Sequence, residues 1–233
     1  MDTKKKELIG NFQRKGKAWS KIAEEVNYYD FTSLAVCRAV QYGIYDVTHN
    51  KGYVYVGTSG DTAEFAADAL ARWWKDEGSL IYPEENKLLI LSDGGGCNGW
   101  RSRPWKQQIQ TKLCDKFGLT GTVCHYPPGC SKWNPVERLL FSRISTNWAG
   151  KPLRTLQIML AYIRGTTTST GLTVKAFLQE GVYDTGQRVT KAELDLLSLQ
   201  PHEVCPNWNY TISLRTSTAI SKSLDDIVEP EKW

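Results

Sequence analysis

The chain has 233 residues, of which 41% are hydrophobic and 23% are charged. This composition supports one folded domain that buries roughly 70–75% of its unfolded surface, and it excludes disordered, collagen-like and coiled-coil proteins. No apolar run approaches the ~20 residues that span a bilayer, and the first residues lack the apolar core of a signal peptide. We therefore expect a cytoplasmic protein with no membrane partner. The six cysteines include no Cys-x-x-Cys pair, which predicts free thiols.

The net charge of +4 is unevenly distributed along the chain. Residues 1–21 carry seven Lys or Arg against two acids, and residues 94–154 carry ten against two, giving +5 and +8. Residues 22–93 carry five against twelve, giving −7. Blocks of positive charge suit a polyanion, because each side chain that neutralises a phosphate releases a counterion. Charge alone favours an ordinary solvated face, so a nucleic-acid partner needs support from chemistry.

The first predicted elements are a hairpin and a helix. Residues 43–47 and 53–57 are rich in β-forming side chains, and the segment between them holds the Asn and Gly of a short turn. Asp61 is expected to cap a helix, with Glu64 as the reciprocal partner. Apolar residues follow at helical spacing, and the helix is expected to end near Gly78.

Strands and helices then alternate. Residues 87–92 form an apolar run that suits a buried strand, and residues 120–126 form a second one. Helices are predicted from Pro104 and from Asn134, where Asn134 is the cap and Pro135 lies in the first turn. Antiparallel strands followed by alternating helices and strands predict a mixed α/β sheet with right-handed crossovers.

The last third of the chain is less regular. We expect a helix, a polar Thr-rich segment, a short helix and one late strand, over residues 153–164, 166–173, 191–199 and 208–214. We assign residues 1–215 to one domain. Residues 216–233 are polar and are expected to form a mobile tail.

Three carboxylates stand at the ends of predicted elements: Asp2, Asp93 and Glu137. Because parallel strands present their carboxyl ends at one edge of a sheet, Asp93 and the loop leading to Glu137 are expected to converge. Convergent carboxylates can hold two Mg²⁺ or Mn²⁺ ions about 3.5–4 Å apart at a phosphodiester. Structural roles also fit: Glu137 completes a capping box with Asn134, Asp93 serves a turn, and Asp2 is a solvated terminal acid.

The sequence resembles the Rhodopirellula-type DDE transposase domain of bacterial insertion sequences. The resemblance rests on residues 2–12, on residues 91–99 (Leu-Ser-Asp-Gly-Gly-Gly-Cys-Asn-Gly) and on residues 124–137, with support from residues 150–153 and 208–212. It implies an α/β ribonuclease-H-like fold, with a mixed five-stranded sheet of order 3-2-1-4-5 flanked by helices. It also implies metal-dependent DNA cleavage and strand transfer at insertion-sequence ends, the chemistry of DNA transposition and recombination.

Matched by position, the resemblance makes Asp2, Asp93 and Glu137 the catalytic acids and the ligands of two Mg²⁺ or Mn²⁺ ions. Water attacks a phosphodiester first, and the freed 3′-hydroxyl then attacks target DNA, so no covalent enzyme intermediate is required. The implied partners are double-stranded DNA, from transposon ends and target, and further copies of the chain in a DNA-dependent homo-oligomer. The implied location is the bacterial cytoplasm, at the nucleoid when DNA is bound.

Other residues are expected to assist these acids. His125 and Asn134 flank the loop to Glu137 and are expected to orient water or a phosphate, and Asn98 is expected to touch the DNA backbone. A histidine at a strand end is also a common structural donor. The candidate phosphate contacts are four basic side chains, Lys132, Arg101, Arg103 and Lys106.

The start of the chain departs from the family pattern, in which the first acid ends a central strand. Only Met1 precedes Asp2, so we expect that strand and the upstream DNA-binding helices to be missing, and the chain to be poorly stable and catalytically impaired. A second hypothesis is therefore a remnant that only binds nucleic acid. A third, a glycoside hydrolase using two of the carboxylates, is supported by nothing beyond scattered tryptophans.

Overall fold

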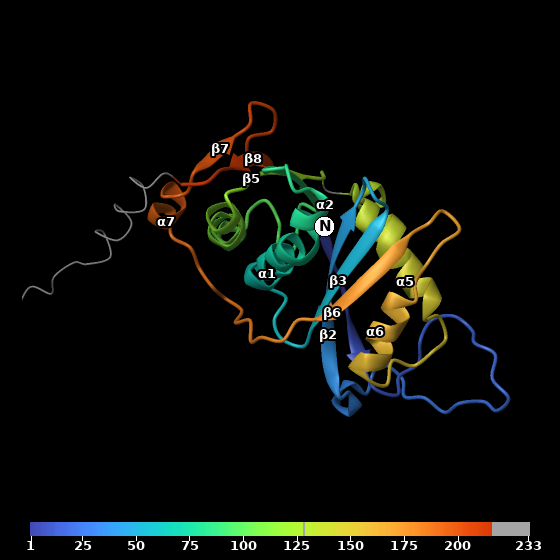
Figure 1. Ribbon diagram of the computed structural model, residues 1–233. Coiled ribbons are helices and arrows are strands. Elements are labelled where there is room, and N and C mark those ends of the chain that lie inside the picture. The colour runs from blue at the N-terminus through green and yellow to red at the C-terminus, as the bar shows by residue number, and fades with distance from the viewer. Residues whose placement is uncertain (128, 216–233) are drawn as a thin grey trace, which may run out of the picture.

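The computed structural model describes residues 1–127 and 129–215, apart from the side chain of residue 131 (Figure 1). The predicted tail, residues 216–233, lies outside the described residues. Within the part that is described, no helix has the length and apolarity needed to cross a membrane. All six cysteines are free thiols, as the sequence predicts.

The described residues form two four-stranded sheets, both of them mixed. The strands are β1 (Asp2–Ile9), β2 (Cys37–Asp46), β3 (Lys51–Gly57), β4 (Lys87–Ser92), β5 (Thr120–His125), β6 (Thr173–Leu178), β7 (Leu199–Pro201) and β8 (Asn209–Ile212). The first sheet has the order β1-β2-β3-β6 and the second β4-β5-β8-β7. Of the strand pairs among the described residues, β3–β6 and β4–β5 are parallel and the others are antiparallel. The mixed α/β class is confirmed, but the described strands do not form one sheet of order 3-2-1-4-5.

Helical segments cover both sheets. They are η1 (Thr32–Leu34), α1 (Ala63–Trp73), η2 (Trp74–Gly78), α2 (Ser79–Ile81), α3 (Arg103–Ile109), η3 (Gln110–Cys114), α4 (Asp115–Phe117), η4 (Ser131–Trp133), η5 (Val136–Phe141), α5 (Ser142–Asn147), α6 (Leu156–Arg164) and α7 (Lys191–Asp195). The predicted helix after the hairpin is confirmed, but Asp61 does not cap it. The Thr62 hydroxyl accepts from the Phe65 N–H instead, so the cap lies one residue later.

Strand β1 begins at Asp2, whereas we expected a strand to end there. Asp2 lies opposite Gly43 of β2 and Ile9 lies opposite Cys37, in antiparallel register. The ladder is irregular between Lys4 and Glu7. The residues that follow the first acid therefore form a strand that runs away from the site.

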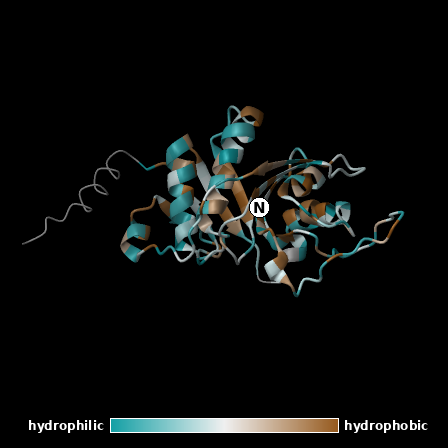
Figure 2. Ribbon diagram, turned by 90° about the horizontal axis from the view of Figure 1, so that it is seen from below, coloured by the Kyte–Doolittle hydropathy of each residue, from teal (hydrophilic) through white to brown (hydrophobic). Residues whose placement is uncertain are grey.

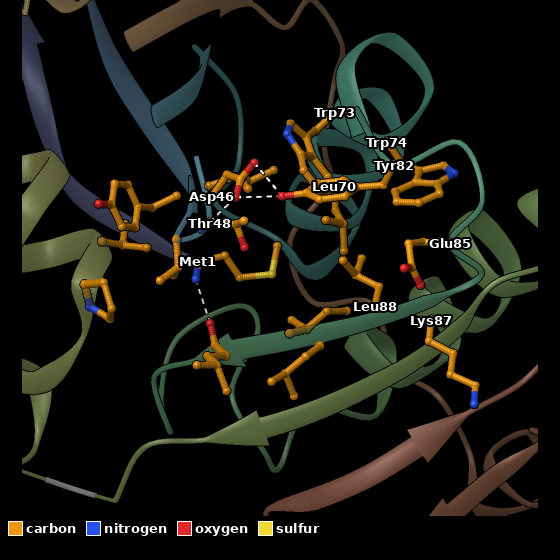
Figure 3. Close-up of a pocket in the computed structure, with 18 of the residues that line it drawn as sticks. Met1, Asp46, Thr48, Leu70, Trp73, Trp74, Tyr82, Glu85, Lys87 and Leu88 are labelled. Carbon is orange, nitrogen blue, oxygen red and sulfur yellow. Dashed lines mark hydrogen bonds between the residues drawn. The ribbon is translucent and has the colours of Figure 1, made fainter. Parts of the chain in front are cut away.

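Two strand edges face each other where the sheets meet. Beyond Gly43, the edge of β2 has no strand partner among the described residues, and neither has the edge of β4 opposite β5. A mainly apolar cavity of about 490 Å³ lies between them and includes Met1 in its lining (Figure 3). The amino group of Met1, the residue before β1, donates to the Leu91 carbonyl of β4 at 2.6 Å.

Two apolar clusters hold the fold together. One joins the β2–β3 face, α1, α3 and the second sheet, through residues such as Tyr53, Phe65 and Ile90. The other packs the opposite face of the first sheet against η5, α5 and α6. Because α1 packs against both α3 and β2, it connects the two sheets (Figure 1). The acids at the element ends therefore sit on two sheets that share one core.

Candidate active site

Asp93 and Glu137 lie where the strand and helix patterns predict them. Asp93 immediately follows the last residue of β4, and Glu137 is in the first turn of η5. Both side chains are half-buried, so each keeps a face toward solvent. Such positions allow a carboxylate to meet a ligand that approaches the sheet edge.

Asp2 is joined to the start of η5 by Asn134. The fully buried Asn134 donates from Nδ2 to Oδ2 of Asp2 at 2.9 Å, and its Oδ1 accepts from the Val136 N–H at 3.1 Å. The N–H of Thr3 donates to the other oxygen of Asp2 at 2.7 Å. One asparagine thus fixes a carboxylate that is 132 residues away in the sequence.

The contacts of Asn134 also test whether Glu137 serves only to complete a capping box. Asn134 caps the helical segment with its side chain, and its carbonyl accepts from the Arg138 N–H at 3.1 Å. Within the described residues, however, Glu137 makes no return bond to the main chain of Asn134. The carboxylate of Glu137 is therefore not used up by a reciprocal capping box.

The three acids lie within electrostatic reach of one another. Burial raises the pKa of Asp2 to about 7; the Thr3 N–H opposes this, while the charges of Asp93 and Glu137 raise it further. Burial also raises the pKa of Glu137, which Lys4 lowers and Asp93 raises. The carboxylates from β1, from the end of β4 and from η5 therefore gather into one region of negative charge.

This arrangement suits a divalent cation chemically but does not enclose one. Carboxylate oxygens are the donors that Mg²⁺ prefers, and a cation would offset the burial and the mutual repulsion that raise the pKa values of Asp2 and Glu137. Yet among the described residues, no group of three or more His, Cys, Asp or Glu side chains is close enough to hold a metal. The donor set fits, and the acids must move closer together to act as one ligand sphere.

His125 and Asn98 occupy the interior beside Asp93. The ring nitrogens of His125 lie 2.7 Å from the Trp208 carbonyl oxygen and 2.9 Å from that of Asn98. The buried Asn98 side chain donates to the Tyr42 hydroxyl at 3.0 Å. Both residues therefore fasten the loop after Asp93 to the sheets, and the Asn98 amide is not presented to solvent.

The family model of the Rhodopirellula transposase DDE domain matches residues 1–214. The chain belongs to this family. No curated protein and no solved structure shows significant similarity to it. Membership supports a transposase of the DDE class, a class that generally uses divalent metals. The match spans all three acids.

The four basic residues expected to contact DNA occupy different settings in this DDE domain. Arg101 and Lys132 are exposed and lie over their neighbouring tryptophan rings, at 4.5 and 5.5 Å from the ring centroids. Arg103 donates to the Val189 carbonyl at 3.3 Å. Lys106 is half-buried over the Tyr210 ring, and burial, together with Arg103, lowers its pKa. Arg101 and Lys132 are therefore better placed than Arg103 and Lys106 to contact DNA phosphates.

Sequence reasoning missed the contribution of β1 to the transposase site. Thr3 donates to Oδ1 of Asp61 at 3.2 Å and contacts Sγ of Cys97 at 3.5 Å, which links the strand to the loop after Asp93. Burial raises the pKa of the Cys97 thiol to about 12, so this thiol stays neutral. Lys4, two residues after Asp2, is the cation that lowers the pKa of Glu137. Period-two spacing from Asp2 would have found Lys4, had residues 2–9 been recognised as a strand.

Proposed function

We propose that this DDE domain catalyses metal-dependent cleavage of DNA at insertion-sequence ends and the following strand transfer. The carrying observation is the convergence of Asp2, Asp93 and Glu137 from distant segments: burial raises the pKa of Asp2 and of Glu137, and the nearby charge of Asp93 raises both further. Perturbed carboxylates gathered at element ends are typical of catalytic sites. The family match gives that arrangement a reaction class.

Each residue has a stated role in the proposal. Asp2, Asp93 and Glu137 would hold Mg²⁺ or Mn²⁺, which when bound activates the attacking oxygen and stabilises the leaving oxygen of a phosphodiester. Asn134 fixes the orientation of the Asp2 carboxylate through its 2.9 Å hydrogen bond. The raised pKa of Asp2 keeps this carboxyl partly protonated near neutral pH until a cation is bound.

The proposed partners are double-stranded DNA and other copies of the chain. Arg101 and Lys132 are exposed next to the loops that carry Asp93 and Glu137, where phosphates of bound DNA would lie. Two transposon ends must be brought together for strand transfer, which favours a DNA-dependent homo-oligomer. The location that follows from this proposal is the nucleoid, where the DNA is.

The test is nicking of a duplex that carries the ends of the insertion sequence, with Mg²⁺ present or chelated. We expect Asp93→Ala and Glu137→Ala each to abolish nicking without loss of DNA binding, whereas Asp30→Ala, at an exposed site, leaves nicking unchanged. Nicking that persists in both acid variants would overturn the proposal. DNA binding that survives chelation, falls steeply with salt and is never followed by cleavage would favour a binding remnant instead.

A further inference from the structure

The connection between β1 and β2 carries a projecting loop. It leaves the body of the molecule beside α6 and extends into solvent with both polar and apolar residues (Figures 1 and 2). Every residue from 15 to 25 is exposed. At its tip Trp19 has a relative exposure of 104%, and Lys15, Lys17 and Lys21 surround it without an intervening acid.

The base of this loop is firmly packed. Phe12 is fully buried with its ring 5.9 Å from that of Tyr29. Arg14 is also buried, pairs with Glu7 and donates to the Leu8 carbonyl at 2.6 Å. The Phe12–Tyr29 contact and the bond from the Gln13 N–H to the Asn27 carbonyl join the two ends of the loop, and the Arg14–Glu7 pair anchors its outgoing end to β1, so the tip is presented from a fixed stem.

A turn after α5 supports the loop from the side. The Gly150 N–H donates to the Lys15 carbonyl at 2.9 Å. Gly150 has φ +70, and a Cβ there would lie 2.7 Å from main-chain atoms of Lys17 and Ala18, so only glycine allows this close approach. Glu24, on the returning side of the loop, pairs with Arg154. These contacts place the tip while leaving its side chains free of the protein body.

An indole surrounded by water forgoes the free energy that burying its apolar surface would give, and clustered lysines repel one another. Both features become favourable when the surface meets a polyanion with flat faces, which is the chemistry of nucleic acid. We propose that the loop tip, residues 15–22, binds the DNA that flanks the cleavage site, with Lys17 and Lys21 on phosphates and Trp19 stacked on a base. This inference rests on the proposed function.

The length of β1 sets where that contact falls. Asp2 and Ile9 are at opposite ends of an eight-residue strand, a separation of about 23 Å at ~3.3 Å per residue. At ~3.4 Å per base pair this corresponds to about 7 base pairs. The loop extends beyond Ile9, so its contact should lie at least that far from the bond that the acids cleave.

The binding test uses duplex DNA with a short unpaired segment, in chelator so that no cleavage occurs. Lys17→Gln with Lys21→Gln should reduce the slope of log K against log salt by about 1.8, because each phosphate contact contributes about 0.9. Lys75→Gln with Lys116→Gln removes the same charge from exposed positions elsewhere and should leave the slope unchanged. Trp19→Ala should weaken binding roughly 5- to 150-fold, and Leu80→Ala, another exposed apolar site, should not.

Two further measurements separate this inference from the proposed function. Hydroxyl-radical footprinting should show protection about 7 or more base pairs from the cleavage position that disappears in the tip variants alone. Cleavage with an unchanged footprint in those variants would overturn the inference and leave the proposed function standing. A footprint that depends on the tip, without any cleavage, would support the inference and overturn the proposed function. Binding of the tip to anionic lipid vesicles in place of DNA would also overturn it.

Discussion

Replacing Asp2 by Asn should stabilise the domain in metal-free buffer above pH 7. The pKa of Asp2 lies at about 7 in the folded protein against an ordinary value of 3.8, chiefly because the carboxyl is buried. A group that binds its proton more tightly when folded favours folding at low pH, and this contribution is lost as the pH rises from about 4 to about 7. Each pH unit corresponds to about 1.4 kcal/mol, so the ionised carboxylate costs about 4 kcal/mol.

The substitution also removes a stabilising hydrogen bond. The Asp2 carboxylate accepts from both Thr3 and Asn134, whereas an amide has one acceptor oxygen and loses one of these bonds, worth about 1–2 kcal/mol. The expected net gain is therefore about 2 kcal/mol at pH 8. The variant should bind and nick DNA poorly or not at all, so that stability and activity move in opposite directions.

Urea unfolding between pH 5 and pH 8 measures the effect. The wild-type chain should lose stability across this range, and the Asp2→Asn variant should lose much less. Added Mg²⁺ should raise the stability of the wild type by mass action and that of the variant hardly at all. An exposed control, Asp30→Asn, should follow the wild type. A variant that is less stable than the wild type at pH 8, or that responds equally to Mg²⁺, would refute the reasoning.

Two further substitutions test the packing of the site. Asn134→Ala leaves Oδ2 of Asp2 and the Val136 N–H without their partners, and should cost about 2–4 kcal/mol in urea unfolding; a loss below about 1 kcal/mol would show that Asn134 is not the link. Gly43→Ala places a Cβ 2.6 Å from the Phe141 ring and should cost about 1–3 kcal/mol. Gly95→Ala, where nothing lies within 4 Å, is the matched control and should be neutral in thermal unfolding.

The central part of the fold could be predicted because its patterns are local. The hairpin residues 43–57 and the apolar run 87–92 are specified by side chains within a few positions of each other, and both appear as strands. The same locality placed Asp93 after a strand and Glu137 on a helix. These placements needed no knowledge of the tertiary structure.

Other features depend on partners far away in the chain. Strand β6 pairs with β3 across more than 100 residues, so the partner that completes it lies outside any local pattern. Strand β1 is lysine-rich because only its later residues are buried. The bond from Asn134 to Asp2 joins two segments that only the folded chain brings together, so a cap was predictable and its second partner was not.

Because the facing edges of β2 and β4 are not paired as strands among the described residues, the acid cluster spans the contact between the two sheets. Asp2 and Glu137 belong to the body built on the first sheet, and Asp93 belongs to the body built on the second. The Met1–Leu91 bond and the packing of α1 span the cavity between the two bodies. A cation held by all three acids would act as a clamp across this contact. The affinity for the cation and the rigidity of the contact between the two sheets would then both depend on the distances between these three acids.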